Sequence, residues 1–378
     1  MNSRERVIAV LNHQKPDRAP LDLCNSASFI NDEGYFALKK HLHIEGDALQ
    51  FRKGYTATYY DERVLKALEI DFRHIWLNPP EGYQPQKFPD GTIQDEWGFI
   101  YKFSGNERAI INAALKGMDG DDLDKYSWPD PYAPGRTRGL ADRAKYLYDH
   151  TGYAIAGHAP HSLGLFDTGW LLRGFNDFML DLVFNKNFIH KLLNKILERI
   201  IGLHDVYLDA VGPYIQTVAH CEDYGMQNAP FISPQMYREF FLPLHKELFR
   251  FIKQKAPQVK IMLHSCGAVY PLIPYFIEAG IDILNPIQHR ANGMDPETIK
   301  REFGRQVVFH GGIDIQRALC GSLQDIEEEA KARIDDLGRE GGYIVAPANV
   351  VQNETPPENI VACYKTAREY SLQRYAGK

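Results

Sequence analysis

A short apolar run that stops at a polar residue, followed by a helical pattern, is the feature that most limits how this chain can fold. Eight such runs occur along the chain. Each run is about four to seven residues long and rich in Ile, Val, Leu and Tyr. Continuous apolar runs of this length are typical of parallel strands that are buried on both faces. The eight runs end at or near Asp22, Leu77, His158, His220, His264, Asn285, His310 and Asn349.

Helix signals fill the intervals between the runs. Ser233 followed by Pro234 is a typical helix start, and Gly280 is a typical helix end directly before a strand. Pro243 should kink the helix in which it lies. Eight alternations of strand and helix predict an α/β fold, a (β/α)8 TIM barrel formed as a single domain by residues 1–378. A doubly wound sheet ranks second, because no glycine-rich phosphate loop follows the first run.

The first three runs are spaced more widely than the others, by about fifty and about seventy-five residues. The segment 78–103 lies in this wide spacing and contains Asp90-Gly91, a dipeptide that favours a tight hairpin turn. We therefore expect an N-terminal insertion in the barrel, with a β-hairpin at this dipeptide.

The charge and the cysteine content exclude several classes of function. Lys and Arg number 43 against 49 Asp and Glu, so the net charge is −6, and nucleic acids and anionic membranes are poor partners. The five cysteines are an odd and sparse set, which favours free thiols over a disulfide framework. The first twenty residues lack the apolar core of a signal peptide, and no long apolar run follows. We therefore expect a cytoplasmic protein without a membrane span. The oligomeric state is left open, with a homodimer among the options.

Four histidines fall at or near predicted strand ends, where the catalytic residues of a barrel lie. Side chains at the carboxyl ends of parallel strands meet at one mouth. We therefore expect His158, His220, His264 and His310 to open onto a common cavity with Asp22. A polar pocket of this kind is costly unless it is used. For any one of these histidines, the alternative is a buried imidazole that binds a backbone carbonyl.

His264 and Cys266 form a His-x-Cys pair after the fifth run, and an imidazole and a thiolate are both good zinc ligands. A zinc site needs at least a third protein ligand. The candidates are His220, Cys221 and Glu222 after the fourth run, His310 after the seventh, and Asn349 after the last. Otherwise Ser265 and Cys266 only begin the helix near Ala268.

Other polar residues at the same end of the predicted sheet are candidates for catalysis or for substrate binding. Glu222 and Asp223 are adjacent carboxylates, and one of them could act as a general base or hold a substrate hydroxyl or amine. A solvated capping loop is the alternative. Gly311 and Gly312 would let the backbone approach a ligand closely. Our candidate catalytic residues are His220, Glu222, Asp223, His264 and His310, and our candidate substrate-binding residues are Asp22, His158, Asn285, Asp314 and Asn349.

Several of these stretches together resemble the uroporphyrinogen decarboxylase superfamily, which includes the decarboxylase of haem synthesis and the corrinoid-linked methyltransferases. The resemblance extends over nearly the whole chain, with its clearest parts in residues 3–23, 222–249, 264–288, 308–319 and 341–360. It implies a single (β/α)8 barrel, in agreement with the pattern of strands and helices.

Two departures from the superfamily's motifs narrow the range of reactions that the resemblance implies. The true decarboxylase carries an Arg-Gln-Ala-Gly-Arg loop after its first strand for the substrate carboxylates. This chain has CNSASFINDEG at residues 24–34, without arginine, which argues against porphyrin decarboxylation because several carboxylates need cationic partners. The zinc methyltransferases use His-x-Cys and a later cysteine. His264 and Cys266 match the first two ligands, but Asn349 stands at about the later position.

The resemblance thus favours the corrinoid-linked methyltransferase branch. It implies transfer of a methyl group between a small molecule (a methoxy or methylamine compound, or methyltetrahydrofolate) and a corrinoid carried by a partner protein. The implied cofactors are Zn²⁺ and either that corrinoid or tetrahydrofolate. One alternative is a cofactor-independent decarboxylase of a smaller acid, which needs an arginine near the mouth, such as Arg18, Arg173 or Arg290. The other is a non-catalytic ligand-binding barrel.

Overall fold

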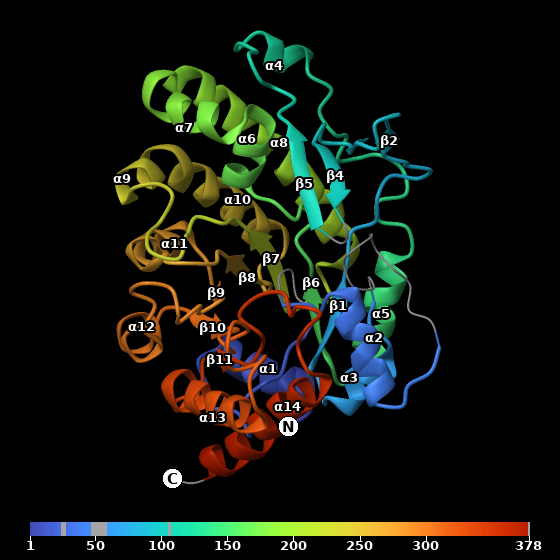
Figure 1. Cartoon of the computed structure of the whole chain (residues 1–378), viewed down its shortest axis with the longest axis vertical. Helices are drawn as coiled ribbons and strands as arrows, with labels where there is room; N and C mark the ends of the chain where they lie inside the picture. Colours follow the sequence, from blue (N-terminus) through green and yellow to red (C-terminus); the bar gives the residue numbers. More distant parts are fainter. Residues whose placement is uncertain (24–27, 47–58, 105–106, 377–378) are drawn as a thin grey trace.

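The computed structural model describes residues 1–23, 28–46, 59–104 and 107–376. A parallel sheet of seven strands lies at its centre (Figure 1). The strands, in their order across the sheet, are β1 (Phe72–Ile75), β6 (Ala154–Gly157), β7 (Thr217–Cys221), β8 (Lys260–His264), β9 (Ile283–Asn285), β10 (Val308–His310) and β11 (Tyr343–Ile344). Neighbours in the sheet follow one another along the chain, so the order never reverses. The doubly wound alternative, which requires a reversal, is therefore wrong.

The first predicted run does not form a regular strand, but it contacts both edges of this sheet. Leu21 forms an isolated parallel bridge with Val345, directly after β11. The N–H of Asp22 donates to the carbonyl of Val345, and the N–H of Asp71, directly before β1, donates to the carbonyl of Leu21, both at 2.9 Å. The sheet is therefore curled, so that its first and last strands both reach the same segment.

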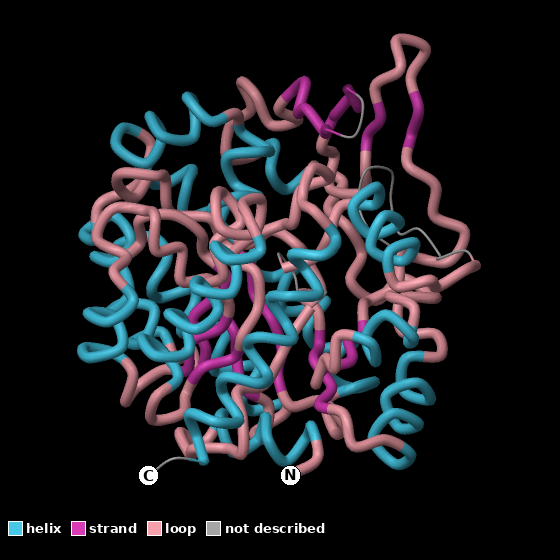
Figure 2. The backbone as a smooth tube through the Cα atoms, turned by 60° about the horizontal axis from the view of Figure 1, so that its bottom comes forward, coloured by secondary structure: helices cyan, strands magenta, loops and turns pink. Residues whose placement is uncertain are grey.

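Helices surround the curled sheet, and Figure 2 shows the strands enclosed by them. The longest helix, α8 (Lys186–Val211), packs against α10 (Leu242–Lys255), and α13 (Leu323–Arg333) packs against α14 (Pro357–Ala376). The other helical elements are α1 (Ser3–Leu11), α2 (Asp32–His41), α3 (Glu62–Ala67), α4 (Asp122–Lys125), α5 (Leu140–His150), α6 (Leu165–Arg173), α7 (Phe175–Phe184), α9 (Pro234–Met236), η1 (Tyr237–Phe241), η2 (Tyr270–Leu272), α11 (Ile273–Ala279), α12 (Pro296–Phe303) and η3 (Ile334–Gly338). Within the described ranges, none of these helices combines the length and the apolarity that a membrane span requires.

The helix signals read from the sequence act at the predicted places. The hydroxyl of Ser233 accepts the N–H of Met236 at 3.1 Å, with Pro234 in the first turn of α9. Gly280 ends α11 with φ of 108°, a left-handed conformation that favours glycine. Where a kink at Pro243 was predicted, the helix changes from α9 to the π-helical segment η1 and then to α10. Pro243 follows this segment and has no N–H to continue the regular ladder.

The predicted insertion forms a second, antiparallel sheet of four strands. These are β2 (Gln86–Lys87), β3 (Ile93–Gln94), β4 (Ile100–Ser104) and β5 (Glu107–Asn112), paired in chain order. The hairpin of β2 and β3 turns at Asp90-Gly91, as predicted, with Gly91 at φ of 81°. In Figure 1, β4 and β5 stand above the parallel strands.

Candidate active site

The register of the parallel sheet decides which polar side chains share a face. Cys221, His264 and Asn285 are Cα partners on three neighbouring strands, so their side chains point to the same side. That side is the interior, which also holds the apolar cluster of Phe72, Ala156, Ala219, Met262, Ile283, Val308 and Ile344. His220 pairs with Leu263 instead and points to the opposite side, toward the helices.

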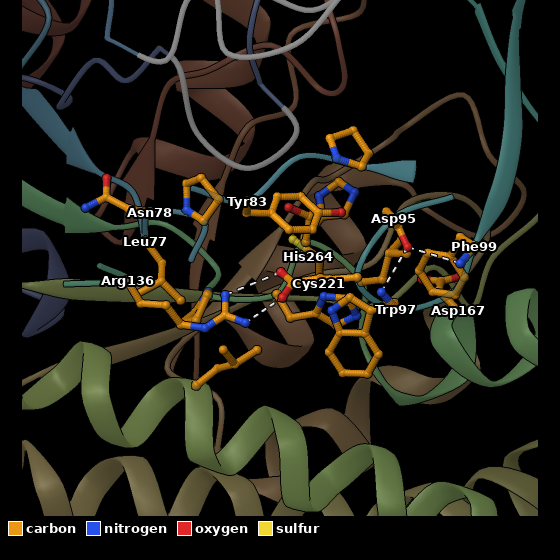
Figure 3. A pocket seen from close by; sticks show the side chains of 18 of the residues that line it. Leu77, Asn78, Tyr83, Asp95, Trp97, Phe99, Arg136, Asp167, Cys221 and His264 are labelled. Carbon is orange, nitrogen blue, oxygen red and sulfur yellow. Dashed lines mark hydrogen bonds and ion pairs between the residues drawn. The ribbon is translucent and has the colours of Figure 1, made fainter. Parts of the chain in front are cut away.

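A cavity of about 600 Å³ lies where the carboxyl ends of the parallel strands meet the inserted sheet (Figure 3). Four of the residues proposed from the sequence line it, namely the candidate ligand Cys221 together with Asp223, His264 and Asn349. Much of the remaining wall comes from the segment after β1, the insertion and the loop after β6, including Leu77, Asn78, Tyr83, Asp95, Trp97, Phe99, Arg136, His161 and Asp167. The insertion therefore completes the cavity that the strand ends begin.

Asp223 and His264 of the cavity wall form a group with Cys266, which brings a carboxylate, an imidazole and a thiol together. Their potential ligand atoms all lie within 4.8 Å of one another. Nε2 of His264 is 3.4 Å from Oδ1 of Asp223, and the N–H of Cys266 donates to the same oxygen at 3.1 Å. The three residues meet because β7 and β8 end side by side in register, with Asp223 and Cys266 each two residues beyond a strand end.

These three groups also shift one another's pKa. Burial by itself would raise the pKa of Asp223, but the hydrogen bond and charge of His264 lower it to about 2. Burial would lower the pKa of His264, but Asp223 and Cys266 raise that pKa well above its usual value. Burial raises the pKa of the Cys266 thiol. On their own, the three groups therefore form an imidazolium–carboxylate ion pair beside a neutral thiol.

The donor set of this group fits Zn²⁺. Zinc takes cysteine, histidine and carboxylate ligands, and a catalytic site has three protein ligands with one position left for water or substrate. Nδ1 of His264 contacts Oδ1 of Asn285 at 2.5 Å, which leaves Nε2 on the side of Asp223 and Cys266. A hydrogen-bond partner on the other ring nitrogen is usual for histidines that bind zinc.

The third member of this group differs from the prediction. The structure brings Asp223 to His264 and Cys266, whereas the predicted ligands His220 and Glu222 form a separate group with His245 of α10. Strand alternation is the physical reason. His220 faces the helices, and Glu222, two residues later, points the same way.

The three remaining candidates for a third ligand also do not join the group. Cys221 lines the cavity beside His264 but is not one of the three grouped residues. His310 lies beyond Asn285, whose amide contacts His264 on one side and Nδ1 of His310 on the other. Asn349 lines the cavity, but its Oδ1 accepts the N–H of Val350 at 2.7 Å.

Glu222 is fully buried, and its carboxylate is satisfied inside the protein. Oε2 accepts the N–H of Phe166 at 3.0 Å, and Oε1 accepts the N–H of Leu165, both at the start of α6. Oε1 also lies 3.4 Å from Nε2 of His220 and 3.2 Å from Nε2 of His245. Burial alone would raise the pKa of Glu222, but the two histidines hold it well below its usual range. These are the contacts of a structural anchor for α6, not of a catalytic base.

Asp22, His158 and His310 do not meet the expectation that they open onto the cavity. All three are buried, and the described residues that line the cavity do not include them. The ring of His158 stacks on Trp76. The oxygens of Asp22 bind Nε2 of His310 and Nε2 of His74, each at 2.8 Å. Burial would raise the pKa of Asp22, but the two histidines hold it well below its usual range.

The predicted arginines lie elsewhere as well. Arg18, Arg173 and Arg290 form ion pairs with Asp71, Asp181 and Asp314, respectively. Asp314, a predicted substrate-binding residue, also accepts the N–H of Gln316 and is not among the described lining residues of the cavity.

An arginine that the sequence analysis missed, Arg136, lines the cavity. Both oxygens of Glu96 bind its guanidinium, at 3.3 and 2.5 Å, and Figure 3 shows this pair in the cavity wall. No signal in the sequence connects this segment with the strand ends, because it reaches the cavity only through the folding of the insertion.

Two further cavity residues were missed although a signal was present. His161 and Asp167 follow the third run within ten residues, where the barrel pattern places cavity side chains. His161 stacks on Trp97 with ring centroids 4.0 Å apart, and burial lowers its pKa to about 3. Burial, followed by the charges of Asp223 and Glu222, raises the pKa of Asp167 well above its usual value. The cavity therefore holds a neutral imidazole and a carboxyl group that releases its proton less readily than usual.

Comparisons with known proteins agree with this fold. The profile of the family described as "Uroporphyrinogen decarboxylase (URO-D)" matches residues 98–370. A uroporphyrinogen decarboxylase of Nostoc punctiforme is 26% identical over 184 residues, which are 49% of this chain and 48% of that protein. A methylated-thiol–coenzyme M methyltransferase of Methanosarcina mazei is 31% identical over 155 residues, which are 39% of this chain and 37% of that protein. In these two matches the chain spans less than half of the length of each relative.

A solved structure is similar to this chain over a greater part of its length. A methyltransferase from Methanosarcina mazei superposes with a TM-score of 0.65 at 15% identity, and the match covers 98% of this chain and 99% of that chain. At this identity the similarity shows a shared fold and leaves the reaction to be argued from the site.

Proposed function

The chain belongs to the uroporphyrinogen decarboxylase family, and from this premise we propose that it is a methyltransferase. The methyl group would move between a small molecule (a methoxy or methylamine compound, or methyltetrahydrofolate) and a corrinoid on a partner protein. The observation that carries the proposal is the group of Asp223, His264 and Cys266, of which Asp223 and His264 line the cavity. The family includes decarboxylases and methyltransferases, and a thiol beside an imidazole and a carboxylate suits a metal-assisted transfer.

Asp223, His264 and Cys266 are the residues that would hold Zn²⁺ in this proposal. When bound, the metal would supply a Lewis acid that lowers the charge on the acceptor or leaving atom of the transfer. The aromatic side chains of Tyr83 and Trp97 contribute to the opposite, inserted part of the wall. They would hold the apolar part of the substrate and exclude water from the reacting atoms.

Asp167 is the residue that we assign as the acid for the leaving atom. Burial and the charges of Asp223 and Glu222 raise its pKa well above the usual value, which favours the protonated carboxyl group that an acid needs. The carboxyl oxygens accept the N–H groups of Trp170 and Asp223 at 3.0 and 2.8 Å, which fixes the side chain at the cavity wall. A proton delivered from Asp167 as the bond to the methyl carbon breaks would release a neutral alcohol or amine.

Decarboxylation of a smaller acid is the second candidate, and Arg136 in the cavity wall is the observation that favours it. Glu96 already binds both ends of that guanidinium. An acidic substrate would have to displace Glu96 before it gained a charged partner. This cost places decarboxylation, and a non-catalytic binding role, behind methyl transfer.

We also propose that the curled sheet closes into an eight-stranded (β/α)8 barrel within a single domain of residues 1–378. The bridge between Leu21 and Val345, and the hydrogen bond from Asp71 to Leu21, support the segment around Leu21 as the closing strand. Amide hydrogen exchange tests this closure. The N–H groups of Asp22, Asp71 and Val345 should exchange as slowly as those in β8, and fast exchange of all three would show an open sheet.

Metal analysis combined with a transfer assay tests the proposed function. The purified protein should contain about one zinc ion per chain and should form methylcobalamin from cob(I)alamin and a methyl donor of the proposed classes. His264→Ala and Cys266→Ala should lose both the zinc and the transfer. Cys320→Ser, which changes a half-buried cysteine outside the described cavity wall, should keep both. Wild-type transfer by His264→Ala, or protein that binds no zinc and forms no methylcobalamin, would contradict the proposal.

A further inference from the structure

A line of buried hydrogen bonds leads from His264 at the cavity into the interior of the sheet. Oδ1 of Asn285 contacts Nδ1 of His264 at 2.5 Å, and Nδ2 of Asn285 contacts Nδ1 of His310 at 2.7 Å. Nε2 of His310 then contacts Oδ2 of Asp22 at 2.8 Å, and Nε2 of His74 contacts the other oxygen of Asp22 at 2.8 Å. Asn285 is completely buried, and the other four side chains are nearly so.

The acceptors in this line determine where the protons lie. The carboxylate of Asp22 only accepts, so Nε2 of His310 carries a proton. The backbone carbonyl of His310 also only accepts, and Nδ2 of Asn285 donates to it at 3.3 Å. This carbonyl fixes the orientation of the amide, with its nitrogen toward His310 and its oxygen toward His264. The amide oxygen needs a donor, so Nδ1 of His264 must carry a proton.

We propose that Asn285 is a positioning residue that keeps a proton on Nδ1 of His264, so that Nε2 is the nitrogen presented to Asp223 and Cys266. His310 is the residue that holds Asn285 in the required orientation, through its carbonyl and its Nδ1. This inference rests on the proposed function, because Nε2 of His264 is the nitrogen that would bind zinc. It replaces the predicted role of Asn285 in substrate binding, because no part of this side chain is exposed.

Two substitutions of Asn285 separate positioning from simple packing, because the two roles predict opposite orders. Asn285→Asp keeps an acceptor toward Nδ1 of His264, but it adds a negative charge to the interior and removes the N–H that faces His310. Asn285→Leu keeps a similar volume without charge but removes the acceptor. A packing role would tolerate Leu better than Asp. A positioning role would be rescued by Asp and lost with Leu, since residues that orient a metal ligand typically change the metal affinity by about 10–100-fold.

Zinc affinity, measured by competition with a chromophoric chelator, is the first readout. Asn285→Leu should bind zinc about 10–100-fold more weakly than the wild type, and Asn285→Asp should retain the wild-type affinity. Asn359→Leu is the matched control, because Asn359 is a buried asparagine that donates only to the carbonyls of Leu319 and Gly321. This control should leave the zinc affinity unchanged. Equal affinities of Asn285→Leu and the wild type, or an equal loss in both Asn285 variants, would overturn the proposal.

The proton position in the metal-free wild type is the second readout, and it requires no folded variant. Nitrogen-15 spectra of histidine-labelled protein, with the His264 signals identified by their loss in His264→Ala, report which ring nitrogens carry a proton. Nδ1 of His264 should be protonated, and an unprotonated Nδ1 would overturn the proposal. If the wild type binds no zinc, the proposed zinc site fails, while an unprotonated Nδ1 of His264 would still overturn the proposed role of Asn285.

Discussion

Replacing Glu222 by glutamine tests whether this residue anchors the structure or acts as a base. The substitution keeps size and shape but turns one acceptor oxygen into a donor. Oε2 accepts from Phe166, and Oε1 accepts from Leu165, His220 and His245. An amide nitrogen in either place therefore meets an N–H group. In the better orientation the amide oxygen replaces Oε1, and the amide nitrogen faces the N–H of Phe166.

The cost of this substitution follows from the lost contacts. A buried backbone N–H without a partner costs about 1–3 kcal/mol. The two histidines lose the charge-assisted character of their hydrogen bonds, which is worth about 0.5–1.5 kcal/mol each. Glu222→Gln should therefore lower the free energy of unfolding at pH 7 by about 2–6 kcal/mol. Because the folded state holds the pKa of Glu222 below its ordinary value of 4.5, this stabilisation exists above that pH and is lost as the pH falls further. The difference between variant and wild type should shrink accordingly in acid.

Urea unfolding followed by circular dichroism at pH 7 and at lower pH measures this difference. Glu239→Gln is the matched control, because Glu239 is exposed and pairs only with Lys186 among its described ion pairs. This control should change the free energy of unfolding by less than about 0.5 kcal/mol. Folded Glu222→Gln should keep its zinc. Equal urea midpoints for Glu222→Gln and the wild type, together with a loss of methyl transfer, would refute the anchoring role and support the catalytic one.

Asp32→Asn should stabilise the protein by about 1–3 kcal/mol at pH 7 but not at pH 4, because burial raises the pKa of Asp32 to about 6 and ionisation above that pH costs stability. An equal gain at both pH values would contradict this cause. Gly164→Ala should lower the thermal midpoint, since an added Cβ would overlap Oε1 of Glu222 and overpacking costs about 1–3 kcal/mol; an unchanged midpoint would show that α6 can move away. Uroporphyrinogen should give no coproporphyrinogen above background by chromatography, because Glu96 already neutralises Arg136, and clear turnover would show that the cavity accepts several carboxylates.

The arginine-free segment 24–34, on which the exclusion of porphyrin decarboxylation first depended, lies partly outside the described residues, at 24–27. The described cavity wall supports the same exclusion independently. Asp95, Asp167 and Asp223 line it together with the Glu96–Arg136 pair, so a polyanionic substrate would meet several carboxyl groups and no unpaired guanidinium among the described lining residues.

The sequence by itself determined where seven of the strands lie, although the first run forms only an isolated bridge at Leu21 and β11 ends at Ile344, before the predicted end near Asn349. A parallel strand that is buried on both faces is a continuous apolar run, and the polar residue that stops it marks the carboxyl end. The run that ends at His264 is β8, and the His-x-Cys pair that follows it meets Asp223 in the structure. The turn at Asp90-Gly91 and the helix end at Gly280 were also predictable, because both depend on local backbone preferences.

Only the tertiary structure decided which side chains face the cavity. Side chains along a strand alternate between its two faces. In a strand that is apolar on both faces, however, the sequence does not show which residues belong to which face. Glu222 and Asp223 were therefore equivalent in the sequence, although one anchors a helix and the other joins His264 and Cys266. The partners His245 and Arg136 come from a helix and from the insertion. Their contacts arise from the packing of segments distant in the chain, for which the sequence pattern carries no signal.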